Sequence, residues 1–104
     1  MIAQKLLTWD IYNIHTAQTE IHGVMLRGRI RKLGLEYGFN ILCENATDEE
    51  RCVRFAMLHK EDPNIIVDYL KRIIPDVNTE LILENVKNPV LSKLKVNEEE
   101  RYTL

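Results

Sequence analysis

The chain of 104 residues is 45% hydrophobic and 29% charged, which is typical of a soluble globular protein and excludes a disordered segment of low hydrophobicity. Its length predicts a single domain over residues 1–104. The formal net charge of -2 argues against a general nucleic-acid binder, which would be strongly basic. Apolar runs are far shorter than the roughly 20 residues that cross a bilayer, and the beginning of the chain does not resemble a signal peptide. We therefore expect a cytoplasmic protein without a membrane partner.

The first half of the chain predicts a strand, a helix and a hairpin. A strand is expected over residues 11–22, although its alternation of polar and apolar residues is poor. Apolar residues then recur at helical spacing up to a glycine, Gly38, which stands where a C′ residue would end the helix. The apolar stripe is Leu26, Ile30, Leu33 and Tyr37. Residues 39–45 and 52–58 are rich in apolar and β-branched side chains around a polar stretch, which is typical of a hairpin.

The second half predicts a helix, a strand and an irregular extension. Asp62 can cap the helix, Pro63 suits its first position, and Pro75 ends it. The residues expected on its buried face are Ile66, Leu70 and Ile73. Residues 79–86 form the last predicted strand. From residue 87 onward, the mixed charges predict an irregular extension.

The predicted order of elements is strand, helix, strand, strand, helix, strand. This is the split βαβ arrangement of α+β, ferredoxin-like folds, a βαββαβ sandwich in which two helices cover one face of an antiparallel or mixed sheet. The predicted core spans about residues 11–86, and the extension over 87–104 is expected to close with a short edge strand at 101–104. In the strand over 52–58, alternation predicts one buried face and one partly polar face that carries Arg54. In the last strand, Leu81 and Leu83 are expected on one face.

Cysteine and histidine residues predict no metal site. Two cysteines, Cys43 and Cys52, are too few for a disulfide framework or a cysteine-built zinc site, and buried packing thiols are the simplest interpretation. A cross-strand disulfide stays open, because the sequence does not fix whether the two lie opposite each other. No His/Cys/carboxylate cluster has ligand spacing, so we expect no metal and no cofactor. The histidines are expected to be surface or half-buried residues: His15, His22 and His59.

A glycine-flanked turn leads into the first predicted helix at Gly23-Val24-Met25-Leu26-Arg27. Backbone N–H groups at such a helix start aim at one point, and an arginine there adds a planar cationic fork suited to phosphate. Arg27, Arg29 and Arg31 also oppose the helix macrodipole, a conflict that a bound anion would relieve. Asn45 lies on the neighbouring predicted strand. Its carboxamide both donates and accepts hydrogen bonds, so it could hold a water against a bound anion.

These residues resemble those of the acylphosphatases, small ferredoxin-like enzymes that hydrolyse carboxylic-phosphoric anhydrides. The family motif is a glycine, a valine, two further residues and the phosphate-binding arginine, here Gly23-Val24-Met25-Leu26-Arg27. The family's catalytic asparagine follows the helix and corresponds to Asn45. The resemblance covers roughly residues 14–86. Shortly before the asparagine, where the family usually has glycine and tryptophan, this chain has Ile41 and Leu42.

The resemblance implies a metal-independent acylphosphatase. Arg27 and the backbone N–H groups of Val24, Met25, Leu26 and Arg27 would hold the phosphoryl oxygens, and Asn45 would position the attacking water. The substrate would be a small acyl phosphate and a product inorganic phosphate. Because the carboxylate leaving group is weakly basic, catalysis needs positioning and charge stabilisation rather than a strong protein base. An alternative stays open: a non-catalytic module of this fold that binds a phosphorylated ligand, RNA or a protein partner.

Overall fold

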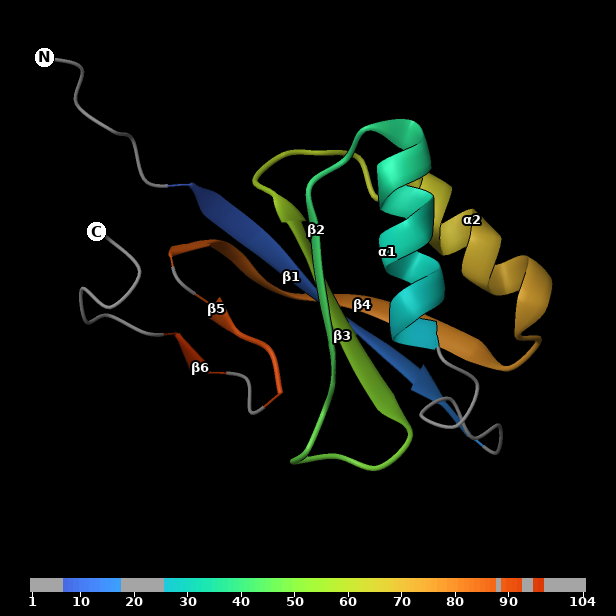
Figure 1. The fold of residues 1–104 in the computed structure, drawn as a ribbon. Helices are drawn as coiled ribbons and strands as arrows, with labels where there is room; N and C mark the ends of the chain where they lie inside the picture. Colours follow the sequence, from blue (N-terminus) through green and yellow to red (C-terminus); the bar gives the residue numbers. More distant parts are fainter. Residues whose placement is uncertain (1–6, 18–25, 88, 93–94, 97–104) are drawn as a thin grey trace, which may run out of the picture.

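The computed structural model describes residues 7–17, 26–87, 89–92 and 95–96, and the structural statements below refer to these residues (Figure 1). The elements are β1 (Thr8–Thr16), α1 (Leu26–Tyr37), β2 (Ile41–Asn45), β3 (Cys52–Leu58), α2 (Asn64–Ile73), β4 (Val77–Lys87), β5 (Pro89–Val90) and β6 (Lys95–Val96). No helix in these ranges is long and apolar enough to cross a membrane.

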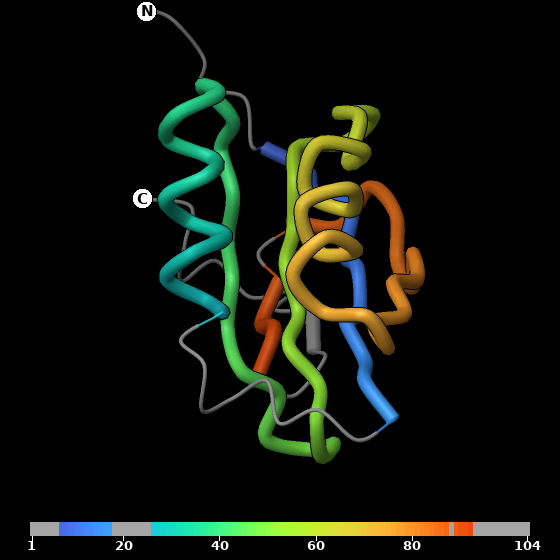
Figure 2. Tube along the Cα trace, turned by 90° about the vertical axis from the view of Figure 1, so that its right-hand side faces the viewer, coloured from blue at the N-terminus to red at the C-terminus, as the bar shows by residue number. Residues whose placement is uncertain are grey.

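Four strands form one antiparallel sheet in the order β2-β3-β1-β4, and β5 pairs with β6 in a separate two-stranded sheet. Both helices lie on the same side of the larger sheet, with α1 running beside β2 (Figures 1 and 2). Their apolar side chains pack with those of one sheet face, here called the helix face. The chain therefore has an α+β fold, and its element order and strand order are compatible with a ferredoxin-like fold.

Two glycines fix how α1 meets β2. A Cβ atom on Gly34 would lie 2.7 Å from Ile41 Cδ1, so the missing side chain lets the helix approach the strand closely. Gly38 ends the helix with a φ of 75°, as the sequence predicts for a C′ glycine. Leu26 and Ile30 are buried, which confirms the first half of the predicted stripe. The stripe predicts that Tyr37 also packs in the core, which is wrong: Tyr37 is 57% exposed and stacks on Phe39.

The second helix begins one residue later than predicted. Pro63 precedes α2, and the backbone N–H of Asn64 donates to Asp62 Oδ1 at 3.0 Å. The carboxylate thus accepts an N–H that the helix leaves without an internal partner. Pro75 follows directly after the C-cap residue Ile74, as expected. Ile74 is buried in place of the predicted Ile73, which is 37% exposed.

Strand β1 lies toward the N-terminus of its predicted position. It spans Thr8–Thr16 rather than 11–22, and residues 18–22 fall outside the described part of the chain. Five consecutive residues of β1, from Asp10 to Ile14, are buried. Because β1 is an interior strand covered on both faces, its sequence lacks the polar alternation that marks a half-buried strand.

A register shift separates the two leucines that were expected to share a face of β4. Leu81 pairs with Tyr12, but Leu83 pairs with Ile11, and the shift between these pairs is a β-bulge. Directly opposite residues share a face, so Leu81 lies with Tyr12 on the helix face and Leu83 with Ile11 on the other. The prediction was wrong because an extra residue in β4 resets the alternation.

The sheet face away from the helices, here called the outer face, is covered by the segment after β4. Leu91, which follows β5, is buried against Ile11 and Ala56. The backbone of Thr47 also donates to Ser92 O at 2.7 Å. Residues 89–92 therefore extend the core past residue 86, where the sequence predicts that it ends. The partly polar face expected for β3 is buried as well, because this segment covers it. The predicted edge strand at 101–104 lies outside the described residues.

The two cysteines lie on opposite faces of the sheet and form no disulfide, and the structure describes both. Cys43 pairs with Phe55 on the helix face, whereas Cys52 pairs with His15 on the outer face. The cross-strand disulfide that the sequence left open is therefore excluded by the register. Both side chains are buried, as expected for packing thiols. Burial raises the pKa of Cys43 to about 12 and that of Cys52 to about 11.

Candidate functional site

Arg27, the second residue of α1, is bound to a carboxylate of the neighbouring strand. Its Nη1 donates to Glu44 Oε2 at 3.1 Å. One turn later on the helix, Arg31 Nη2 donates to Glu44 Oε1 at 3.1 Å and to the carbonyl of Cys43 at 3.0 Å. A single carboxylate at the end of β2 thus joins two arginines of α1.

Glu44 meets an electrostatic need of α1. The first turn of this helix holds Arg27 and Arg29 but no acidic residue, so it places positive charge at the positive end of the helix dipole. The sequence predicts that an anion would relieve this conflict. In the structure, the side chain of Glu44 supplies this anion. Sequence reasoning did not single out Glu44, because its proximity to α1 depends on how the helix packs on β2.

Asn45 is the last residue of β2 and is half-buried. It pairs with Val53 on the helix face, whereas Glu44 pairs with Arg54 on the outer face. Arg27 therefore lies beside the end of β2 that carries Asn45, but its guanidinium is directed to the neighbouring residue on the other face. Of the predicted cradle, Leu26 is buried in the core and residues 23–25 lie outside the described part of the chain.

The two residues that depart from the acylphosphatase pattern lie at the other end of β2. Ile41 begins the strand and packs against Gly34 of α1, away from Asn45 at the end of the strand. Leu42 faces outward and is 37% exposed. The space beside Asn45 is therefore not filled by the side chain of Ile41.

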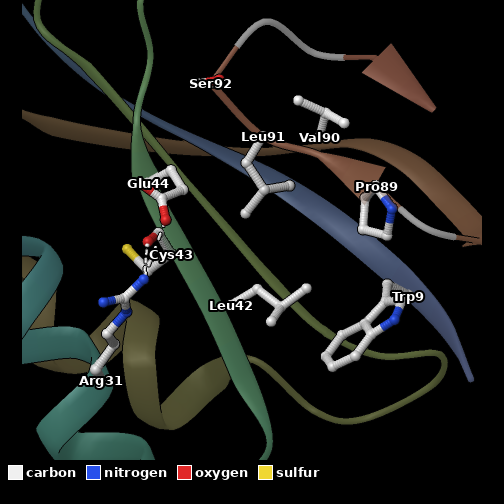
Figure 3. Close-up of a pocket in the computed structure, with 9 residues that line it drawn as sticks. All are labelled: Trp9, Arg31, Leu42, Cys43, Glu44, Pro89, Val90, Leu91 and Ser92. Carbon is white, nitrogen blue, oxygen red and sulfur yellow. Dashed lines mark hydrogen bonds and ion pairs between the residues drawn. The ribbon is translucent and has the colours of Figure 1, made fainter. Parts of the chain in front are cut away.

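A groove of about 490 Å³ lies on the outer face, between β2 and β5 (Figure 3). Its walls are largely apolar, and the ion pair between Arg31 and Glu44 stands at one end. The lining residues are Trp9, Arg31, Leu42, Cys43, Glu44, Pro89, Val90, Leu91 and Ser92. Arg27 and Asn45 do not line this groove.

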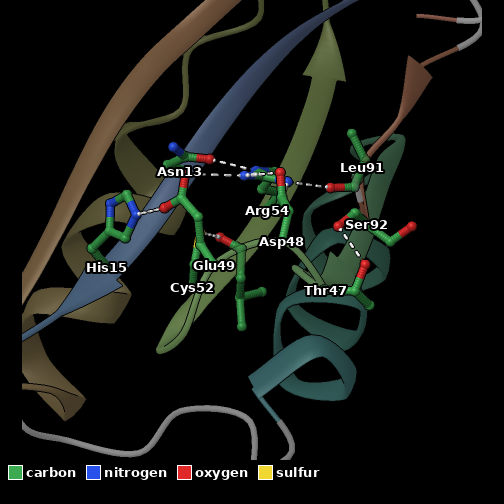
Figure 4. A network of polar contacts seen from close by, with 10 residues as sticks. Asn13, His15, Thr47, Asp48, Glu49, Cys52, Arg54, Leu91 and Ser92 are labelled. Atoms are coloured by element: carbon green, nitrogen blue, oxygen red, sulfur yellow. Dashed lines mark hydrogen bonds and ion pairs between the residues drawn. The ribbon is translucent and has the colours of Figure 1, made fainter. Parts of the chain in front are cut away.

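A second polar cluster surrounds Arg54, whose side chain is fully buried on the outer face (Figure 4). Its Nε donates to Asn13 Oδ1 at 2.8 Å, and its Nη1 donates to Leu91 O at 2.9 Å. Both Nη atoms also donate to Asp48, at 2.8 and 3.3 Å, and Nη2 donates to Glu49 Oε1 at 3.4 Å. One arginine thus ties β1, the β2–β3 loop and the segment after β5 together. Its hydrogen bonds hold the pKa of Asp48 below the ordinary value.

The same loop brings together three side chains with metal-ligating atoms, a group that sequence reasoning missed. His15 and Cys52 are directly opposite each other on β1 and β3. His15 Nε2 lies 2.5 Å from Glu49 Oε2. One nitrogen, one oxygen and the sulfur of these residues all lie within 4.8 Å of one another. No spacing in the sequence indicates this group, because cross-strand register and the fold of the loop create it.

Asp10 forms a third polar cluster, at the other end of β1. Its carboxylate is bound by His59 Nδ1 at 2.7 Å, by the backbone N–H of Lys60 at 3.0 Å and by that of Asn85 at 2.9 Å. Lys60 and Asn85 both have positive φ, so one carboxylate holds two left-handed backbone positions. Burial raises the pKa of Asp10, but these hydrogen bonds lower it by more, and the net shift is downward.

No family model, curated protein or solved structure matches the chain. Its function is therefore inferred from its residues and their geometry.

Proposed function

We propose that this chain is a metal-independent acylphosphatase with a ferredoxin-like fold. Arg27 would bind the phosphoryl group and Asn45 would position the attacking water. The observation that carries the proposal is the contact between Arg27 and Glu44, the residue immediately before Asn45. It brings the cation at the start of α1 to the strand end that bears the carboxamide, as the resemblance to acylphosphatases implies.

The start of α1 suits an anion for two further reasons. Its backbone N–H groups lack acceptors within the helix, and its dipole favours negative charge. Arg27 is exposed enough to turn toward a ligand, with 46% of its side chain in contact with solvent. The resemblance assigns the remaining N–H donors to Val24 and Met25. Positioned donors of this kind stabilise the charge that develops on the phosphoryl oxygens.

Glu44 would hold Arg27 until substrate arrives. Its side chain is 43% exposed, and an ion pair between exposed groups contributes only about 0.2–1 kcal/mol. A phosphoryl group offers a planar guanidinium several negatively charged oxygens and two parallel hydrogen bonds. It can therefore displace the carboxylate from Arg27, while Arg31 keeps its own bond to Glu44.

One observation favours a second candidate, a module that binds a phosphorylated ligand without hydrolysing it. The Arg27 guanidinium bonds to Glu44 on the outer face, whereas Asn45 is on the helix face. Anion binding requires only that Arg27 be released. Catalysis also requires that the released guanidinium and Asn45 face one bound phosphoryl group.

Hydrolysis of benzoyl phosphate separates the two candidates. The assay compares wild type with Arg27→Ala and Asn45→Ala, and Arg29→Ala serves as a matched control because Arg29 is an exposed arginine of the same helix turn. We expect turnover by wild type and Arg29→Ala, and a loss of about 100-fold or more in the other two variants. The far-ultraviolet circular dichroism of all four proteins should agree.

A thermal shift with inorganic phosphate completes the test. Protection by phosphate that is lost in Arg27→Ala, without any turnover by wild type, would support the binding module. Wild type with neither turnover above buffer nor protection at several millimolar phosphate would contradict both candidates.

A further inference from the structure

Three different donor atoms meet on the outer face of the sheet, where β1 ends and β3 begins (Figure 4). His15 contributes an imidazole nitrogen, Cys52 a sulfur and Glu49 a carboxylate oxygen, all within 4.8 Å of one another. The strands fix two of them, because His15 and Cys52 are direct cross-strand partners. The third comes from the β2–β3 loop and already bonds to His15.

We propose that His15, Glu49 and Cys52 bind a divalent cation of the zinc class. Imidazole, thiolate and carboxylate are the ligands that zinc takes in proteins, and three protein ligands leave a fourth position open. Metal–ligand bonds of about 2.0–2.3 Å place the corners of a tetrahedron about 3.3–3.8 Å apart. The His15 and Glu49 donor atoms, now 2.5 Å apart, would need to open by about 0.8 Å, and no pair would need to close by more than about 1.5 Å. The partly exposed side chains of His15 and Glu49 can supply these movements.

The surroundings of Glu49 orient it for this role. Its Oε1 accepts from the buried Arg54, which leaves Oε2 directed at His15. Outer hydrogen bonds of this kind commonly hold the ligands of metal sites in place. The positive charge of Arg54 does not exclude a cation, because Asp48 and Glu49 both pair with it and give the three side chains a net charge of -1.

Binding would replace protons by metal at two of the ligands. The cation would take the place of the hydrogen between His15 Nε2 and Glu49 Oε2, and that proton would go to solvent or, by a change of tautomer, to His15 Nδ1. At Cys52 the S–H bond breaks, a sulfur–metal bond forms and the proton goes to solvent. The site lies on the outer face and does not depend on the proposed hydrolysis.

Titration of the metal-free full-length chain with Co²⁺ tests the site, because cobalt reports thiolate ligation by its absorption. We expect one equivalent to bind, with a thiolate-to-cobalt charge-transfer band that Zn²⁺ abolishes by displacement. Cys52→Ser should remove the band. The matched control is Cys43→Ser, which removes the other buried cysteine from the opposite face and should leave the band unchanged.

Half-exposed ligands provide variants that keep the fold. His15→Gln and Glu49→Gln should each weaken Co²⁺ binding by about tenfold or more, with an unchanged circular dichroism spectrum. The proposal would be overturned if wild type showed no charge-transfer band, or if the band survived in Cys52→Ser. Co²⁺ binding by His15→Gln as tight as that of wild type would overturn it as well, even if Cys52→Ser failed to fold.

Discussion

Replacing Glu44 by glutamine should strengthen anion binding at the start of α1. In the wild type one carboxylate oxygen accepts from Arg27 and the other from Arg31. Glutamine keeps the length and shape of the side chain but removes its charge. Arg27 then loses its ionic partner and becomes available to a phosphate without a competing carboxylate beside it.

Two terms set the size of this effect. Releasing Arg27 from an exposed ion pair costs a ligand about 0.2–1 kcal/mol in the wild type and almost nothing in the variant. The Glu44 carboxylate, taken as about 6 Å from a bound phosphate, also repels each negative charge of that phosphate by about 0.7 kcal/mol in water. Together the terms amount to about 1–2 kcal/mol, which makes phosphate binding about 5- to 30-fold tighter in Glu44→Gln.

Calorimetric titration with inorganic phosphate at low ionic strength measures this difference. Glu36→Gln is the matched control, because it removes the same charge from an exposed position in the last turn of α1. The expected order is tighter binding in Glu44→Gln and unchanged binding in Glu36→Gln. Unchanged or weaker phosphate binding in Glu44→Gln would refute the competition between Glu44 and the ligand. Equally tighter binding in both variants would refute it too, because the gain would then come from the change in net charge alone.

Three further predictions test the fold around the site. Gly34→Ala should lower the free energy of unfolding, measured in urea, by about 1–3 kcal/mol because the added Cβ would collide with Ile41. Gly28→Ala places its Cβ in open space and should raise the same free energy by about 0.5–1 kcal/mol. Equal effects of the two substitutions would contradict the close approach of α1 to β2. Arg54→Met should cost about 3 kcal/mol in the same experiment because the buried acceptors Asn13 Oδ1 and Leu91 O each lose their donor, and a cost below about 1 kcal/mol would argue against this role. The pKa of Asp10 is lowered in the folded state, so its contribution to stability is present above about pH 4 and lost as the pH falls through the lowered value. The melting temperature should fall more steeply below pH 4 in wild type than in Asp10→Asn, and parallel slopes would contradict the assignment.

Much of the fold follows from local sequence signals. Gly38 and Pro75 mark the ends of the two helices, and the predicted strand over 52–58 coincides with β3. Strand β1 was misplaced because burial on both faces removes the alternation that reveals a strand. The faces of Leu81 and Leu83 were misjudged because a bulge is a property of strand pairing and leaves no local signal in this chain.

In the candidate site too, features set by local sequence could be predicted, and contacts set by tertiary packing could not. A helix start and a strand end can be predicted locally, so sequence reasoning could single out Arg27 and Asn45. The bond from Arg27 to Glu44 depends on how α1 packs beside β2. The cluster of His15, Glu49 and Cys52 depends on the register between β1 and β3. Such contacts join residues far apart in the chain, and a single sequence contains no spacing that indicates them.

The rate of benzoyl phosphate hydrolysis in excess chelator tests the central claim most directly, because the chelator separates the proposed reaction from any bound cation. We predict wild-type turnover that the chelator does not change and that falls by about 100-fold or more in Asn45→Ala. A wild-type rate equal to that of buffer, or an Asn45→Ala variant as active as wild type, would contradict the claim.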